Sequence, residues 1–106
     1  MDIIKGKIVE MDNYEDEKRS YEIEQITAEF EEDIADVIGV VRCTGIIIES
    51  KAPLKINSQA ETMLYNELAD VEYNDVDSTR EYEKKARKDI SKRTGIDASQ
   101  IIIERL

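Results

Sequence analysis

The chain has 106 residues, 41% of them hydrophobic and 38% charged, and its 25 acidic against 15 basic side chains give a formal net charge of −10. It contains no histidine, no tryptophan and one cysteine. These counts exclude histidine-based acid–base and metal chemistry, serine–histidine and cysteine–histidine nucleophiles, and disulfide scaffolds, because each class needs a residue that the sequence lacks. We predict a single domain over residues 1–106, a size that buries an ordinary core without crosslinks.

The first half of the chain predicts a strand followed by a helix. Residues 3–11 mix β-branched residues with lysines, which is typical of a strand. Between Ile23 and Val37, apolar residues recur at intervals of three and four, which favours a helix over about residues 20–38. Gly39 would end this helix.

A second interpretation divides the same segment. In this alternative, residues 19–25 form a strand in a hairpin with the first strand, and a helix starts at Thr27. The sequence leaves both interpretations open, because local patterns determine the boundaries of elements poorly.

The second half of the chain predicts a strand, two helices and a closing strand. Residues 40–49 contain three consecutive isoleucines, which favours a central strand covered on both faces. Two serine–x–x–glutamate capping boxes open predicted helices over residues 58–69 and 78–95. Residues 100–106 predict the last strand. The order of elements indicates an α/β (α+β) fold, in which two or three helices cover a sheet of three or four strands with the Ile-rich strands at its centre.

Acidic side chains predict one interaction surface. On a helix over residues 20–38, Glu22, Glu29, Glu32 and Asp36 would lie along one face. Such a face can dock on a basic protein, or can copy the phosphates of a nucleic acid and inhibit a protein that binds one. The alternative is a solvated surface without a partner.

Basic side chains predict a second surface at the other end of the chain. Arg80, Lys84, Lys88 and Lys92 step by four along the last predicted helix, in a part of the chain that is otherwise less acidic than the rest. This stripe favours a contact with phosphates or with an acidic partner, or else a solvated helix face. We do not expect direct nucleic-acid binding, because the acidic remainder of the chain would repel a polyanion.

Two further motifs give little support for a metal site or a reactive residue. Residues 70–81 partly resemble the oxygen-ligand spacing of a calcium loop, but Asp75 stands where that loop needs glycine. Cys43 lies in the middle of a predicted strand with no histidine to activate it, so we expect a buried, unreactive thiol. We therefore predict no metal, no cofactor and no catalytic residue.

Together these features predict a non-enzymatic, regulatory module that binds a basic macromolecular partner. The alternative is a structural protomer, in which the acidic helix of one copy contacts the basic helix of the next. The longest unbroken apolar runs are three residues, far below the roughly 20 that span a bilayer, and no secretory signal precedes them. We therefore expect a cytoplasmic protein without a membrane segment.

Overall fold

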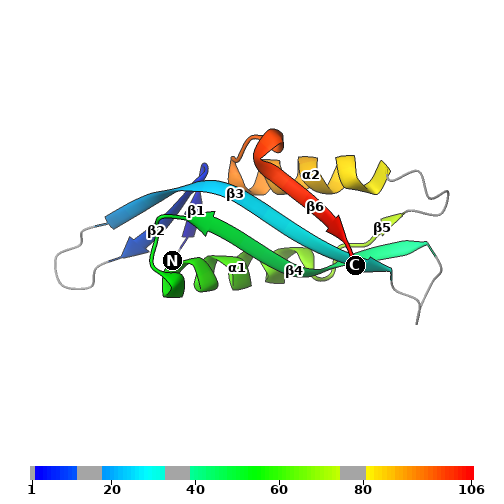
Figure 1. The fold of residues 1–106 in the computed structure, drawn as a ribbon, viewed down its shortest axis with the longest axis horizontal. Coiled ribbons are helices and arrows are strands. Elements are labelled where there is room, and N and C mark those ends of the chain that lie inside the picture. The colour runs from blue at the N-terminus through cyan, green and yellow to red at the C-terminus, as the bar shows by residue number, and fades with distance from the viewer. Residues whose placement is uncertain (1, 12–17, 33–38, 75–80) are drawn as a thin grey trace.

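The computed structural model describes residues 2–11, 18–32, 39–74 and 81–106. Within this part, a six-stranded sheet is packed against two helices (Figure 1). The strands are β1 (Asp2–Ile4), β2 (Lys7–Met11), β3 (Lys18–Glu32), β4 (Val40–Ser50), β5 (Tyr73–Asn74) and β6 (Ile101–Arg105). The helices are α1 (Leu54–Leu68) and α2 (Glu81–Thr94), followed by the 3-10 turn η1 (Ala98–Gln100). The α+β class is confirmed, whereas the sheet is larger than the predicted three or four strands.

The long strand β3 is the centre of the sheet. It pairs antiparallel with β4 along one edge, and it pairs antiparallel with β2 and parallel with β6 elsewhere. The Ile23 amide donates to the Gly6 carbonyl at 2.8 Å, while Ile23 itself stands in register with Ser50 of β4. The β2 and β4 strands therefore lie on opposite edges of β3, and β2 and β6 follow one another along the same edge.

The predicted helix over residues 20–38 is wrong for its described part, because residues 18–32 form the strand β3. The hairpin of the alternative interpretation is confirmed, since β2 pairs with the first five residues of β3. The helix that this alternative starts at Thr27 is also wrong. Residues 33–38 lie outside the described residues. The isoleucine and phenylalanine spacing fits a helix, but in β3 the buried Ile26, Ala28 and Phe30 share one face with the two-residue period of a strand.

The N-terminal segment forms a hairpin where a single strand over residues 3–11 was predicted. Lys5 and Gly6 both have positive φ, 41° and 82°, and they turn the chain between β1 and β2. Glycine adopts this conformation without steric cost, so Gly6 is the local cause of the turn.

One face of the sheet forms the core. Because residues in register share a face, Ile26 of β3 lies between Ile48 of β4 and Ile101 of β6. All of these side chains are buried in one hydrophobic cluster that also includes residues of both helices. The helices therefore cover this face, and they contribute buried residues at intervals of four, Ile56, Ala60, Leu64 and Leu68 from α1 and Tyr82, Ala86, Ile90 and Thr94 from α2.

An aromatic cluster closes one end of this core. The ring of Phe30 contacts those of Tyr73 and Tyr82 edge-on, at centroid distances of 5.5 and 5.8 Å. The Tyr73 hydroxyl donates to Asp89 Oδ2 at 3.0 Å. Burial, together with this carboxylate, raises the pKa of Tyr73.

The described part of α2 agrees with the predicted helix over residues 78–95, whose capping residue Ser78 lies outside the described residues, but α1 starts before its predicted position. This helix begins at Leu54, directly after Pro53, and has no side-chain cap. The predicted capping box of Ser58 and Glu61 does not form, because both residues lie inside the helix. The Glu61 carboxylate instead accepts a hydrogen bond from the Ile48 amide at 2.8 Å.

The last helix and strand lie where the sequence predicts them. The described part of α2 ends at Thr94, and Gly95 follows with a φ of 75°, a conformation that favours glycine. The strand β6 then runs from Ile101 to Arg105. Among the described residues, neither helix combines the length and hydrophobicity that a bilayer-spanning segment needs.

Candidate interaction surface

The structure separates the acidic residues that were predicted to share a helix face. Glu29 and Glu32 lie on opposite faces of β3, because three residues apart in a strand means opposite sides of the sheet. Glu22 is exposed at the other end of β3, beside Lys7 of β2. Asp36 lies outside the described residues. The predicted acidic face is therefore not formed by these residues.

Glu32 has structural partners on the helix-covered side. Its Oε1 accepts the Gly39 amide at 3.0 Å, and its Oε2 lies 3.7 Å from the Arg105 guanidinium. Arg105 also lies over the ring of Tyr82, with 5.6 Å between its Cζ and the ring centroid. These contacts tie the end of β3 to β6, so Glu32 contributes to the fold.

The opposite face of the sheet is not covered by either helix, and its centre is apolar. Thr27 of β3 stands in register with Ile47 of β4 and Ile102 of β6, which forms a row across three strands. Ile47 and Ile102 are 44% and 39% exposed, whereas Thr27 between them is 8% exposed. We call this side of the sheet the uncovered face, formed by Gln25, Thr27, Glu29, Glu31, Arg42, Gly45, Ile47, Glu49, Ile102 and Glu104.

Carboxylates surround this apolar row. Glu104 and Glu29 are in register on one side of it, and Glu49 lies on the other side opposite Gln25. Glu31 follows Glu29 by two residues, on the same face. Within the described residues, the uncovered face therefore carries excess negative charge around an apolar centre.

Gly45 shapes the position of Glu29. A Cβ atom added at Gly45 would stand 2.5 Å from Glu29 Oε1, so the glutamate side chain lies directly over the glycine. The Thr44 hydroxyl donates to the Glu29 carbonyl at 3.4 Å beside a register shift between the two strands. Because glycine has no side chain, the Glu29 carboxylate can pack against the backbone of β4 at Gly45.

The described basic side chain on this face is already paired. Arg42 is in register with Glu31 and forms a salt bridge with Glu72, with 2.6 Å between Nη2 and Oε1. The guanidinium therefore offsets the charge of a glutamate at the margin of the face. Arg42 lies at this margin and not beside the apolar row, so the described residues of the uncovered face place no cation among Glu29, Glu49 and Glu104.

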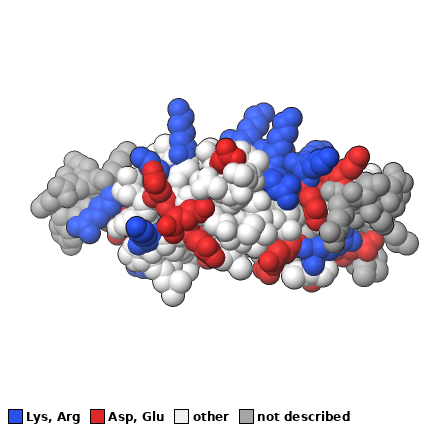
Figure 2. Space-filling model, turned by 45° about the horizontal axis from the view of Figure 1, so that its top comes forward, with Lys and Arg blue, Asp and Glu red and all other residues white. Residues whose placement is uncertain are grey.

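The predicted basic stripe lies on α2, except for Arg80, which is outside the described residues. Lys84, Lys88 and Lys92 are all exposed on this helix. In Figure 2, lysine and arginine side chains gather at the upper right, over α2, and carboxylates are scattered around a pale surface below them. The described residues of the predicted basic stripe thus lie on a helix, whereas the described residues of the predicted acidic face lie in the sheet.

The single cysteine is buried, as predicted. Cys43 is 2% exposed on the covered face of β4. Burial raises the pKa of its thiol, and the nearby negative charge of Glu29 adds to this effect. The thiolate is therefore disfavoured, the opposite of what a nucleophilic cysteine needs. Of the calcium-like segment over residues 70–81, residues 75–80 lie outside the described part.

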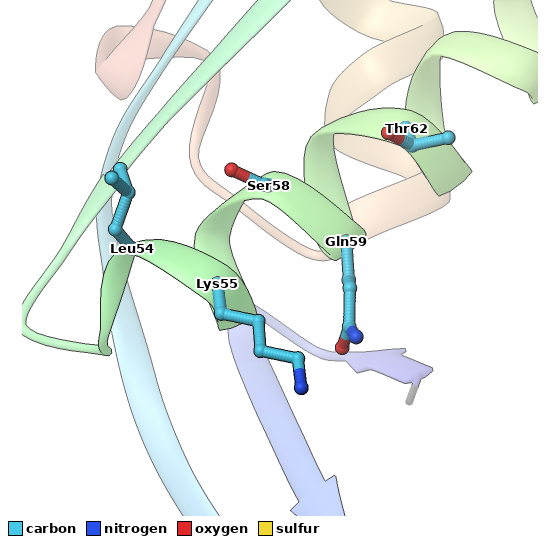
Figure 3. Close-up of a pocket in the computed structure, with 5 residues that line it drawn as sticks. All are labelled: Leu54, Lys55, Ser58, Gln59 and Thr62. Atoms are coloured by element: carbon cyan, nitrogen blue, oxygen red, sulfur yellow. The ribbon is translucent and has the colours of Figure 1, made fainter.

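The outer side of α1 carries a shallow hollow rather than an enclosed cavity. It is bounded by Leu54, Lys55, Ser58, Gln59 and Thr62, and Leu54 is 81% exposed. Figure 3 shows that Lys55 and Gln59 point away from Leu54 and Ser58. Because these side chains diverge, the hollow has no convergent polar groups for a small ligand.

No protein family, curated protein or solved structure matches the chain. Of the predicted acidic residues, Glu29 belongs to the uncovered face, which sequence analysis otherwise missed. The signal was present in the alternation of residues 26–31, where apolar Ile26, Ala28 and Phe30 alternate with Thr27, Glu29 and Glu31.

Proposed function

We propose that this protein is a non-enzymatic binding module whose uncovered face docks on a basic protein partner. The supporting observation is the row of Ile47, Thr27 and Ile102, half-exposed at its ends and surrounded by carboxylates. An apolar centre with a charged rim is the composition of a protein-binding surface. The apolar row contributes contact area, and the carboxylates attract and orient the partner.

The apolar row favours a protein over a nucleic acid as the ligand. Phosphates would be repelled by Glu29, Glu49 and Glu104, which surround the row. An inhibitor that copies nucleic acid needs an extended array of charges and no apolar centre, so the row favours the broader class of basic protein surfaces. A partner helix with lysines around a leucine stripe has the complementary chemistry.

The test uses a labelled amphipathic peptide of leucine and lysine, with binding followed by fluorescence anisotropy. A triple variant, Glu29→Gln, Glu31→Gln and Glu104→Gln, should weaken binding about tenfold at low salt. Each exposed charge pair contributes little, and the loss of three pairs together amounts to about this factor. The matched triple variant removes three exposed carboxylates elsewhere, at Glu22, Asp70 and Glu81. It should change binding about twofold or less. Equal losses in the two triple variants would contradict docking on this face.

A second variant separates the apolar contribution from the charges. Ile47→Thr and Ile102→Thr keep β-branched side chains, so the strands should persist. Their effect on peptide binding should remain at high salt, where the carboxylate effect is screened. An Ile47→Thr/Ile102→Thr protein that binds like the parent at every salt concentration would remove the apolar row from the proposal.

Self-assembly remains the alternative, in a changed form. Its predicted acidic helix is the strand β3, so the contact would join the uncovered face of one copy to α2 of another. Sedimentation at low and high salt tests this contact. An oligomer that Lys84→Gln, Lys88→Gln and Lys92→Gln dissociate would favour this alternative over a separate partner.

A further inference from the structure

The strand β4 has one edge without a strand partner over most of its length. Its other edge pairs with β3 as far as Ser50, whereas β5 pairs only with Val40 and Val41. From residue 43 to residue 50, no described strand adds to this edge. Unpaired edges expose backbone donors and acceptors in the spacing that another strand needs.

The direction of the backbone groups follows from one hydrogen bond. The Ile48 amide donates to Glu61 of α1, so it points away from β3. In an antiparallel ladder, a residue whose amide points outward also directs its carbonyl outward, and the pattern repeats every second residue. The amide and carbonyl of Ile46 and the carbonyl of Ile48 therefore point to the open edge.

A groove lies beside this edge. It has a volume of about 370 Å³ and runs between β4 and α1, lined by Thr44, Gly45, Ile46, Ser58, Glu61, Thr62 and Tyr65. Ser58 and Thr62 also line the shallow hollow of Figure 3, so the groove continues along α1 toward the exposed Leu54. One wall thus offers backbone hydrogen bonds, and the other offers hydroxyl groups and one carboxylate.

We infer that this groove binds an extended segment of a partner chain as an added strand beside β4, with a lysine or arginine side chain directed at Glu61. This inference goes beyond the proposed function, because it concerns the edge of the sheet and not its uncovered face. The charge of the groove favours a basic occupant, since Glu61 is the only charged side chain among the described residues that line it. Backbone pairing supplies affinity, and the facing side chain supplies specificity.

A second copy of this chain is a poorer occupant. Thr44 is an extra residue opposite the Glu29–Phe30 step of β3, a bulge that interrupts the regular edge. Glu61 brings a negative charge to the same edge, and each chain has a formal net charge of −10. Bulges and charges at edges oppose pairing between identical strands.

The experiment uses a labelled heptapeptide probe, threonine–valine–threonine–lysine–threonine–valine–threonine, and its counterpart with glutamate at the centre. The lysine peptide should bind about tenfold more tightly than the glutamate peptide. Glu61→Gln keeps an oxygen for the Ile48 amide but removes the charge, so it should reduce this preference to about twofold or less. Glu67→Gln, an exposed change on the same helix, is the matched control and should leave the preference intact.

Strand addition itself is tested by two N-methylated forms of the lysine peptide. Methyl groups on alternate amides block either the edge that faces β4 or the edge that faces solvent. One form should therefore lose at least about tenfold in affinity, while the other should stay within about twofold. Equal affinities of the two forms, or no binding of the parent peptide, would overturn the inference.

The remaining outcomes are also distinct. The triple variant Glu29→Gln, Glu31→Gln and Glu104→Gln should keep its affinity for the heptapeptide, because those residues lie on the uncovered face. Loss of binding in that variant would assign the peptide to the uncovered face and overturn the edge site. A dimer in sedimentation that Glu61→Gln strengthens would make a second copy the occupant, and it would equally overturn the inference.

Discussion

The two faces of β3 differ in what their side chains do, although they alternate along one strand. Ile26, Ala28 and Phe30 are fully buried beneath the helices. Thr27 and Glu29 lie between them in sequence and face the uncovered side, where isoleucines remain half-exposed. Every second residue in this part of β3 thus belongs to the core, and the residues between them form a surface. Substitutions on the covered face should therefore change stability, and those on the uncovered face should change binding.

The largest effect is expected for Phe30→Ala. This substitution leaves a cavity beside Tyr73 and Tyr82, so the free energy of unfolding should fall by about 3–5 kcal/mol. Glu31→Ala is the control, because Glu31 follows Phe30 and lies on the opposite face. It should change the free energy of unfolding by about 0.5 kcal/mol or less. Urea denaturation measures both. Similar losses for the two variants would contradict the division between the faces.

A second comparison uses two glycines. A Cβ at Gly95 would lie 2.6 Å from the Lys5 Cα, and Gly95 has a φ of 75°. Gly95→Ala should therefore cost about 1–3 kcal/mol of unfolding free energy. The Cβ of Gly45→Ala on the uncovered face would contact the flexible side chain of Glu29. This substitution should therefore lower the free energy of unfolding less than Gly95→Ala does, and thermal denaturation compares the two. A larger loss at Gly45 would mean that the Glu29 carboxylate cannot move aside.

The covered face should also make stability depend on alkaline pH. Burial raises the pKa of Cys43 above its ordinary 9.0 and that of Tyr73 above its ordinary 10.0. The folded protein then holds these protons more tightly than the unfolded chain, so stability is fully present below pH 9 and falls as pH rises above it. Denaturation at pH 8 to 11 measures the slope. Cys43→Ala with Tyr73→Phe should flatten it, and an unchanged slope would contradict this origin.

The smallest effect is expected at the margin of the uncovered face. Glu72→Gln removes the charge that faces Arg42, in a pair whose glutamate side chain is 57% exposed. Exposed pairs contribute little, so the free energy of unfolding should change by about 1 kcal/mol or less, and less still at high salt. A loss above about 2 kcal/mol in urea denaturation would show that this margin belongs to the folded framework.

Several features could be predicted from local sequence alone. The strand β4, the described part of α2, the strand β6 and the burial of Cys43 were predicted correctly. The prediction that both faces of β4 are covered is wrong, because Ile47 on one of these faces is 44% exposed. In α2, buried residues recur every four positions between Tyr82 and Thr94, and Gly95 ends the helix. The Ile-rich segments needed burial in any fold, although β6 and most of β4 proved to border β3 rather than form the centre of the sheet.

Whether residues 18–32 form a strand or a helix is decided by the tertiary structure. Ile23, Ile26 and Phe30 fit one stripe of a helix, while Ile26, Ala28 and Phe30 fit one face of a strand, so the sequence supports both. In the structure, β4 and β6 occupy the two edges of the second half of β3 and supply hydrogen bonds from residues far along the chain. The uncovered face arises in the same way. The sequence contained Thr27, Ile47 and Ile102, but only the register of three strands brings them into one row, because local patterns carry no information about which strands pair.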